Sequence, residues 1–405
     1  MLALTKYSFM ETIYHFFKED KANAVLLVIA CLLLCFLLYK VAGIKIRFNK
    51  KEPRTVFSWS PSVSTPYNYP VELLSCKVGF GDKGKSIPVL GSFPRLGIGR
   101  RGAGGVDLNA FDIESGLPIP NSLDILWASY TEKKFYKANV KFSEELQYRM
   151  LELFREGYYG VKEKQRFRYN NLVITLLPEG KIWLYLDGSH RYVRLDYTLQ
   201  AEEVSVKLSD YVDTRHKTMD EFCTGRLSDY PKAIDNLSKN GIPKGLWDTY
   251  AERFPYDIKV EFENEQTVFD PDYGYYCSNG EMFGSLDDVK PYPMARLKHL
   301  IMAWSVTDTV YLGHLYFNEY EVIHKYPEAF DNTSNPNIRG EFLINVSKYN
   351  NWFDISLRVG ERECKFEKTQ IHVFKRGVNQ PKKEAVIYYN NHQHIHSSDI
   401  KFIGE

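Results

Sequence analysis

One stretch of the sequence matches a phosphate-binding motif in its letters. Residues 79–86 read GFGDKGKS, which fits the pattern G-x4-G-K-S. A loop of this kind binds phosphate where it opens directly into a helix, whose first amide groups hold the anion. Pro88 and Pro94 follow here instead, so no helix can begin properly. We therefore interpret the string as a hairpin turn with solvated lysines, and we expect no nucleotide cofactor.

A second glycine-rich string, at 97–102, has the form G-x-G-x-x-G and fails the same test. It continues into Ala-Gly-Gly at 103–105 rather than into a helix. The simplest interpretation is a glycine-rich loop without a ligand. Its functional interpretation is a loop that contacts a partner through Arg100 and Arg101, because loops carry many of the binding residues of proteins.

Three histidines near the end alternate in sequence, at His392, His394 and His396. On a strand they would project from one face and could hold a transition metal. Asp399 is the one obvious carboxylate nearby, so a polar tail is the simpler interpretation, and we predict no metal site. The motifs H-E-x-x-H, G-x-S-x-G and C-x-x-C do not occur in the sequence. We predict no catalytic residues, which makes an enzyme the weaker class.

The composition indicates a folded protein without a strong electric field. The chain has 405 residues, of which 44% are hydrophobic and 25% charged, enough for two ordinary domains. With 52 basic and 51 acidic residues the net charge is +1, which disfavours a nucleic-acid partner. Aromatic residues reach 15%, and Tyr and Trp suit strands and wet interfaces.

An uncharged apolar run near the N-terminus predicts a membrane anchor. Residues 22–39 read ANAVLLVIACLLLCFLLY, with Lys21 and Lys40 at the two ends. At about 1.5 Å per residue, a helix over 22–41 just crosses a hydrocarbon core of about 30 Å. The alternative is a lipoprotein cleavage site before Cys31. The apolar run continues beyond this cysteine, however, whereas a lipoprotein normally continues into a polar tether.

Two passages of the chain look like copies of one unit. Trp127 leads through Tyr136 to Phe-Ser at 142–143, and Trp304 leads through Tyr311 to Phe-Asn at 317–318. Ser and Asn are good caps for the helices predicted to follow. The string Tyr-Asn-Asn also occurs twice, at 169–171 and 349–351. Two similar offsets favour an ancient duplication.

The sequence predicts an α+β protein with an N-terminal transmembrane helix and two similar strand-rich lobes of antiparallel sheets with a few helices. Short alternating runs such as LVITLL and EFLINVS predict the strands. Between the copies, Ser228, Gly241 and Pro243 predict the limits of two helices. The expected parts are a tail (1–21), the transmembrane helix (22–41), a connector (42–70), a first lobe (71–215), a helical segment (216–256) and a second lobe (257–405).

A succession of short motifs resembles a bacterial family. These motifs are Tyr-Pro-Val at 69–71, Leu-Trp-Ala-Ser at 126–129, Leu-Pro-Glu-Gly at 177–180, Gly-Ile-Pro-Lys-Gly-Leu-Trp at 241–247 and Asn-Gly-Glu at 279–281. Their order is similar to that of the family known as domain of unknown function 2931. The resemblance implies a gammaproteobacterial envelope lipoprotein, often encoded near type VI secretion cargo, and suggests an immunity protein. It implies no catalytic residues.

Charge and resemblance disagree about the side of the membrane. Six basic residues follow the apolar run and three precede it, which by the positive-inside rule places the globular region in the cytoplasm. The resemblance implies the periplasmic side of a bacterial inner membrane, and we adopt it while leaving the cytoplasmic side open. The even number of remaining cysteines permits disulfides but requires none.

The leading hypothesis is a membrane-anchored, non-enzymatic envelope protein that binds a protein effector. The alternatives are an envelope enzyme acting on lipid or glycan, and a structural component of the envelope. We expect no cofactor, and the sequence leaves the oligomeric state open. The predicted partner-binding residues are arginines and large aromatic residues, the types that dominate protein interfaces. They are Arg100, Arg101, Trp127, Tyr136, Trp304 and Tyr311.

Overall fold

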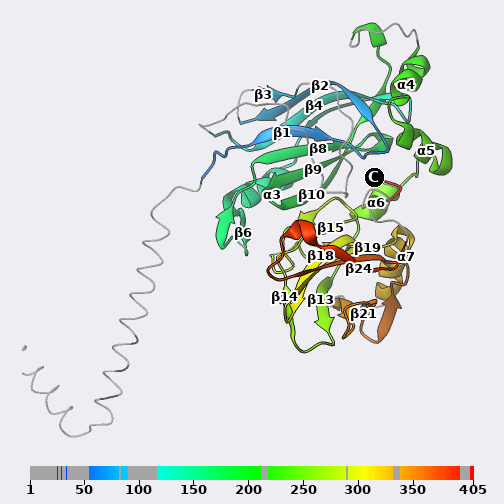
Figure 1. The fold of residues 1–405 in the computed structure, drawn as a ribbon. Coiled ribbons are helices and arrows are strands. Elements are labelled where there is room, and N and C mark those ends of the chain that lie inside the picture. The colour runs from blue at the N-terminus through cyan, green and yellow to red at the C-terminus, as the bar shows by residue number, and fades with distance from the viewer. Residues whose placement is uncertain are drawn as a thin grey trace, which may run out of the picture. The chain divides into compact units, whose positions relative to one another are not determined.

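The computed structural model describes residues 54–81, 84–89, 116–161, 163–210, 218–288, 291–331, 338–392 and 402–405, together with Val25, Ile29 and Leu33. The chain divides into two compact units, residues 1–54 and residues 55–405. The second unit contains the strands of Figure 1, coloured from blue at β1 to red at β24.

The predicted membrane anchor is corrected by the structure. None of the helices in the described part of the chain is long and apolar enough to cross a membrane. A crossing needs about 20 consecutive apolar residues in a helix, and between 22 and 41 the structure describes three residues, which are helical and exposed. The rest of that segment lies outside the described residues. This finding overturns the predicted fold class with its transmembrane helix, and the predicted single-pass location in an inner membrane.

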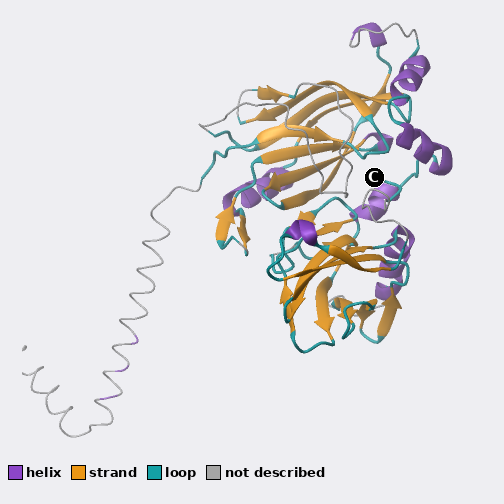
Figure 2. Cartoon of the chain, viewed as in Figure 1, coloured by secondary structure: helices purple, strands orange, loops and turns teal. Residues whose placement is uncertain are grey.

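Strands dominate the unit from 55 to 405, with few helices (Figure 2). Its first part contains two sheets. One sheet has the order β1 (Ser60–Ser64), β8 (Asn171–Leu176), β9 (Lys181–Gly188) and β10 (Arg191–Gln200). The other has the order β11 (Glu202–Val204), β5 (Lys134–Lys141), β4 (Pro120–Ser129), β2 (Val71–Phe80) and β3 (Lys85–Pro88).

The second part of this unit is also built from two sheets. One has the order β13 (Tyr256–Phe262), β20 (Gly340–Val346), β21 (Phe353–Val359) and β22 (Arg362–Lys365). The other has the order β15 (Tyr275–Cys277), β18 (Leu297–Val306), β19 (Thr309–Tyr316), β23 (Gln370–Gly377) and β24 (Val386–Asn390), with β14 (Thr267–Asp270) paired to β18. Short pairs complete the strands: β6 (Tyr158–Gly160) with β7 (Gln165–Phe167), and β12 (Arg253–Phe254) with β17 (Met294–Ala295).

The order of elements occurs twice. The succession β4, β5, α3, β8, β9, β10, β11 in the first repeat (60–204) returns as β18, β19, α7, β20, β21, β22, β23 in the second repeat (256–377). Each repeat begins with a strand that pairs in parallel, β1 with β8 and β13 with β20. Each ends on a strand that pairs antiparallel with the second strand of the succession, β11 with β5 and β23 with β19.

The tryptophans of the two copies occupy equivalent positions. Trp127 lies opposite Tyr136 on β4 and β5, and Trp304 lies opposite Tyr311 on β18 and β19. The repeated Tyr-Asn-Asn string does not mark equivalent positions, because Tyr169 precedes β8 whereas Tyr349 follows β20. One of the two sequence offsets was therefore coincidental.

The helices follow their capping residues. Ser143 caps α3 (Glu144–Glu156) and Asn318 caps α7 (Glu319–Phe330), as predicted. Each capping side chain accepts a hydrogen bond from the backbone amide three residues later. Between the repeats lie α4 (Met219–Leu227), α5 (Pro231–Asn240) and α6 (Leu246–Ala251). Gly241 ends α5 as predicted, but Ser228 closes α4 instead of capping α5. The turn at Gly245, in the left-handed region, delays α6 to Leu246.

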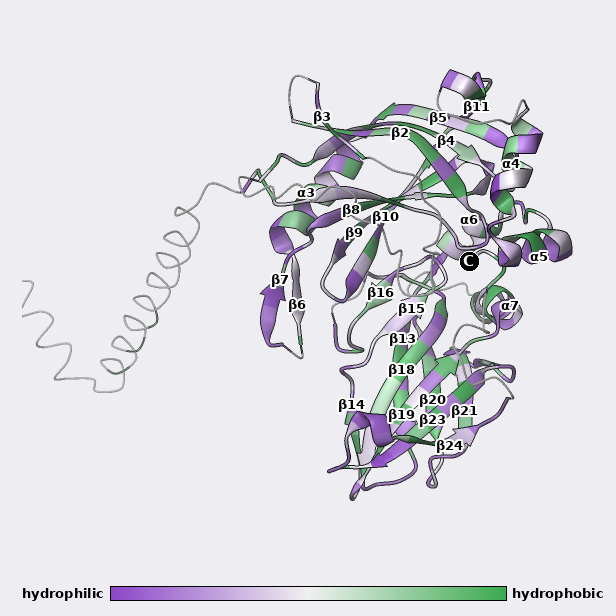
Figure 3. Cartoon of the chain, turned by 45° about the horizontal axis from the view of Figure 1, so that its top comes forward, coloured by the Kyte–Doolittle hydropathy of each residue, from purple (hydrophilic) through white to green (hydrophobic). Residues whose placement is uncertain are grey.

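The repeats share one sheet and one main core. β10 of the first repeat pairs with β16 (Met282–Phe283), which pairs with β15 and so continues the first sheet into the second repeat. Apolar residues of the central strands, such as β18 and β20 in Figure 3, belong to one continuous cluster of buried residues. The proposed limits at 71–215, 216–256 and 257–405 stay a prediction.

The repeat offers a matched test of its two caps. We expect Ser143→Ala and Asn318→Ala each to lower the free energy of unfolding by about 1 kcal/mol, because an amide at the helix start loses its acceptor. Urea unfolding measures both. Ser143→Asn and Asn318→Ser exchange the two caps and should be nearly neutral. Equal losses in the alanine and exchange variants would contradict the capping role.

Candidate functional site

The predicted contact residues lie mostly in the core. Trp127, Tyr136 and Trp304 are 0%, 5% and 1% exposed, and each tryptophan packs on its cross-strand tyrosine at 5.4 or 5.5 Å between ring centroids. Of these four aromatic residues, Tyr311 alone keeps a half-buried ring. Arg100 and Arg101 lie outside the described residues. The partner-binding role of these residues stays a prediction, and a direct contact is open to Tyr311.

None of the described residues of the glycine-rich strings and the alternating histidines forms a ligand site. The phosphate-like string belongs to the antiparallel pair β2 and β3, so the predicted hairpin is confirmed. The string at 97–102, His394 and His396 lie outside the described residues. His392 packs against His372, with 4.1 Å between the rings. Among the residues that the structure describes, no group of three or more His, Cys, Asp or Glu side chains is placed to hold a metal ion.

The turn between β20 and β21 holds two exposed aromatic side chains. Asn350 adopts the left-handed conformation at φ 60°, and its Oδ1 accepts a 2.8 Å hydrogen bond from the buried indole of Trp304. Ser347 closes the turn, since its N–H and its hydroxyl both bond to the backbone of Trp352. With the turn fixed to the core in this way, Tyr349 and Trp352 are 72% and 67% exposed.

The equivalent turn of the first repeat is covered. It is the short helical turn Pro178–Gly180 between β8 and β9, where Glu179 has the same left-handed conformation at φ 64°. The Glu179 carboxylate accepts a 3.1 Å bond from the amide of Gly245, and Lys181 reaches Asp248 of α6 at 2.6 Å. The start of α6 thus packs on the turn of the first repeat, whereas the turn of the second repeat presents its aromatic rings to solvent.

A hollow of about 440 Å³ opens beside the exposed turn. It lies where the chain crosses from β22 to β23 through residues 366–369. Its lining includes Trp352, Phe353, Phe366, Ile371, Tyr389 and Asn391. In the first repeat the crossing from β10 to β11 takes one residue, Ala201, whose amide bonds to the carbonyl of Gly180 at 2.8 Å and closes the same seam. The longer crossing therefore creates the hollow.

Tyrosines connect this turn to the last strand. The ring of Tyr388 meets that of Tyr311 edge to face at 5.4 Å, and its hydroxyl donates to the carbonyl of Tyr349 at 2.7 Å. Tyr389 lies 6.0 Å from Phe353, ring to ring. We call the exposed and half-buried rings around the hollow the aromatic surface. It consists of Tyr349, Trp352, Phe353, Tyr388 and Tyr389.

A second hollow, of about 450 Å³, lies at the start of α7. Its described lining holds one carboxylate, that of Glu319, together with His324 and Lys368. Burial raises the pKa of Glu319. Its two oxygens already accept hydrogen bonds, from the hydroxyl of Tyr250 and from the amide of Ile403. Internal partners therefore occupy this carboxylate, and it fixes the C-terminal residues to α6 and α7.

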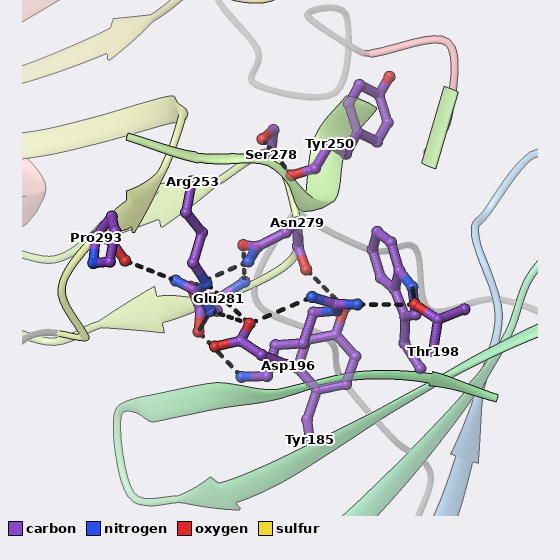
Figure 4. Close-up of polar contacts among 11 residues, drawn as sticks. Tyr185, Asp196, Thr198, Tyr250, Arg253, Ser278, Asn279, Glu281 and Pro293 are labelled. Atoms are coloured by element: carbon purple, nitrogen blue, oxygen red, sulfur yellow. Dashed lines mark hydrogen bonds and ion pairs between the residues drawn. The ribbon is translucent and has the colours of Figure 1, made fainter. Parts of the chain in front are cut away.

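A charged cluster joins the two repeats (Figure 4). The Arg253 guanidinium donates two hydrogen bonds of 2.7 and 2.9 Å to the carboxylate of Glu281 and one of 2.8 Å to the carboxylate of Asp196. Glu281 is 1% exposed and also accepts from the backbone amide of Arg194 on β10. Burial lowers the pKa of Arg253, but Glu281 and Asp196 outweigh it and hold that pKa above its ordinary value. The cluster therefore has a structural role, because its charged groups pair with one another.

Histidines of β18, β19 and β23 lie on adjacent strands of the second repeat's sheet. His299 lies opposite Tyr316, and His314 lies opposite His372, on adjacent strands. The rings of His299 and Tyr316 stack at 4.0 Å. Burial lowers the pKa of His299 well below its usual range and that of His314 to about 4. These imidazoles are therefore neutral at pH 7.

The fold and the aromatic surface define a strand-rich protein with an internal repeat and an exposed aromatic site on its second copy. Residues 47–245 match the model of a family described as protein of unknown function (DUF2931). This match supports a domain family of unknown function for the first repeat and the helices α4 and α5. It does not test the gammaproteobacterial lipoprotein character that the resemblance implied. No curated protein and no solved structure matches the chain.

Sequence reasoning missed Tyr349 and Trp352. The one signal available was the polar turn string YNNW, in which Asn tolerates the left-handed conformation and pushes its neighbours outward. Their exposure depends on the hydrogen bond between Asn350 and Trp304, which joins residues 46 positions apart. Local patterns do not report such a contact.

Breaking the ion pair between Arg253 and Glu281 should destabilise the fold. We expect Arg253→Met to lower the free energy of unfolding by about 3–5 kcal/mol, because Glu281 would remain buried without its cation. The double variant Arg253→Met, Glu281→Leu should recover much of this loss. Urea unfolding compares both with Lys239→Ala, which removes an exposed ion pair and should cost under about 1 kcal/mol. A cost for Arg253→Met no larger than this control would contradict the structural role.

The half-buried His314 predicts an acid-sensitive fold. The unfolded chain binds a proton on His314 near pH 6.5, whereas the folded chain resists it down to about pH 4. Stability from this group is complete above about pH 6.5 and falls by about 3 kcal/mol as the pH drops to 4. We expect His314→Gln to remove this part of the pH dependence in urea unfolding. The exposed-site control His324→Gln should keep it, and identical profiles for the two variants would refute the assignment.

Proposed function

We propose that the chain is a non-catalytic protein-binding protein whose partner docks on the aromatic surface. The observation that carries this proposal is the exposure of Trp352 and Tyr349 on a turn fixed to the core through Asn350. Trp and Tyr are the residues that most often dominate binding energy at protein interfaces, especially beside a hollow that excludes water. The hollow of about 440 Å³ next to Trp352 is lined by aromatic and charged side chains, and a docked partner would displace water from it.

The rigidity of the turn supports this proposal. A turn whose backbone is already held in place loses little conformational entropy when a partner binds, so more of the contact energy remains as affinity. The turn of Trp352 is closed by its bonds to Ser347, and Tyr349 is held by Tyr388 through its carbonyl. Large rings held by a fixed backbone are suited to a preformed contact.

The first repeat provides a precedent within the same molecule. Its equivalent turn is a contact for a protein segment, since Glu179 and Lys181 bind the backbone of Gly245 and the carboxylate of Asp248. The second repeat keeps a left-handed residue in this turn, Asn350, but its turn is two residues longer and carries rings in place of the charged contacts. We infer that it offers the equivalent place to a protein from outside the chain.

The nature of the partner follows from the family resemblance. Resemblance to the family of unknown function suggests an immunity protein, and we propose that the partner is a protein effector encoded by a neighbouring gene. Neutralising an effector requires a stoichiometric complex and no turnover, which a fixed aromatic surface can supply. The family match covers residues 47–245 and gives the family alone; the aromatic surface lies beyond it, in the second repeat.

The test uses the full chain and the purified product of the neighbouring gene. We expect a stoichiometric complex, and we expect Trp352→Ala and Tyr349→Ala each to weaken binding at least about tenfold in calorimetry, equivalent to about 1.4 kcal/mol. The matched control is Tyr148→Ala, which removes a 63% exposed tyrosine from α3 and should leave affinity unchanged. Growth protection against the effector should fall in the same order as affinity.

Two results would contradict the proposal. One is an effector complex that is equally tight with Trp352→Ala and with Tyr148→Ala, which would place the contact elsewhere. The other is growth protection without any complex, which would replace binding by another activity. Thermal unfolding of each variant confirms that the aromatic substitutions leave the fold intact, as expected for side chains 67% and 72% exposed.

A further inference from the structure

The last strand of the long sheet is an unguarded edge. β24 has the sequence Val-Ile-Tyr-Tyr-Asn and pairs with β23 on one side; on its other side no strand of the described chain pairs with it. Val386 and Ile387 are 56% and 46% exposed. An exposed apolar edge is a template for pairing with another chain, and natural proteins normally block such edges.

Apart from β14 and the two-stranded pairs, the other outer strands of the described sheets are blocked by charges, prolines or burial. β3 carries Lys85 and Pro88, and β11 carries two glutamates. β13 alternates Asp257, Lys259 and Glu261 with apolar residues. β22 reads Arg-Glu-Cys-Lys, and β1 is almost fully buried and contains a proline. Charges and prolines at an edge discourage pairing, so β24 differs from these strands in chemistry as well as in exposure.

β24 is an addition to the repeat. The first repeat ends with β11, which is the edge of its sheet and is equivalent to β23. The second repeat continues beyond β23 into η3 (Lys382–Glu384) and β24; after β11 the described residues contain a similar short turn, η2 (Leu208–Asp210), but no strand that pairs with β11 on its outer side. The repeated fold is complete without β24. Its presence therefore extends the sheet outward, beside the aromatic surface to which Tyr388 and Tyr389 contribute.

The hairpin that carries β24 is positively charged. Between 375 and 390 the sequence contains Lys375, Arg376, Lys382 and Lys383 against Glu384, a net of +3 from four positive and one negative residue, whereas the whole chain has +1. Lys382 and Lys383 are exposed and form no ion pair with the described residues. The Lys375 ammonium lies over the ring of Tyr388 at 4.4 Å. The charges therefore line the approach to the edge strand.

We propose that β24 receives an extended, acidic segment of the partner protein, which pairs with it as an additional strand. This inference rests on the proposed function and specifies how the partner binds. Backbone hydrogen bonds would give affinity, and acidic side chains of the segment would meet the lysines beside the strand. A second copy of this chain fits less well, because two such contacts would bring two hairpins of charge +3 together.

The test uses the full chain and a fluorescent peptide in which Glu and Val alternate, with a Lys-Val peptide of equal length as its counterpart. We expect saturable binding of the acidic peptide and at least about tenfold weaker binding of the basic one. Lys382→Glu with Lys383→Glu should weaken the acidic peptide about tenfold. Lys232→Glu, at an exposed lysine of α5, is the matched control and should have little effect.

Backbone pairing needs its own measurement. The amides of 386–390 should exchange with deuterium more slowly when the acidic peptide is bound, since they enter a new ladder. Ile387→Pro should abolish binding, because proline interrupts strand pairing, whereas Ile387→Thr keeps strand propensity and should retain binding. Circular dichroism of each variant verifies the fold.

Three outcomes would overturn the inference: equal binding of both peptides, unchanged exchange at 386–390, or a dimer of the free chain that Ile387→Pro dissociates. The last would make a second copy the occupant of β24. An effector complex that depends on Trp352 but not on Ile387 or the lysines would leave the proposed function standing and remove this inference. Peptide binding at β24 together with an effector complex insensitive to Trp352→Ala would remove the proposed function and leave the pairing at β24 standing.

Discussion

Each repeat depends on a tryptophan that packs across the sheet against a tyrosine of the next strand. In the second repeat the indole of Trp304 also donates a hydrogen bond to Asn350, and this bond connects the turn above it to the core. Because the indole is 1% exposed, its N–H cannot be satisfied by bulk water, and an unpaired buried donor is costly. The positions of Tyr349 and Trp352 at the surface thus follow from a polar requirement in the core.

The two repeats use the same framework for different ends. In the first, a short crossing and the packing of α6 close the seam beside the turn. In the second, three more residues in the crossing and an additional strand leave a hollow rimmed by aromatic rings. Duplication allows this division, since one copy can keep the closed and stable form while the other diverges. The charged cluster around Arg253 and Glu281 holds the two copies together at β10 and β12.

Local features of the fold were predictable from the sequence, and long-range ones were not. The caps at Ser143 and Asn318 and the β2–β3 hairpin follow from rules that involve neighbours within a few residues. The side of a strand that becomes buried depends on the partner sheet, so Trp127 and Trp304 could be recognised as equivalent but not as core residues. The apolar run at 22–39 shows a related limit, because hydropathy describes composition and does not by itself establish a helix of membrane-spanning length.

The pairing of β10 with β16 has an evolutionary consequence. The family match ends at residue 245, whereas β16, which pairs with Arg191 and Tyr192 at the start of β10, lies at Met282–Phe283. A gene shortened to the matched region would encode a sheet in which the start of β10 lacks this pairing partner. The second repeat is therefore more than an appendage to the first, because it supplies the pairing partner of β10 and the Glu281 carboxylate that accepts from the Arg194 amide.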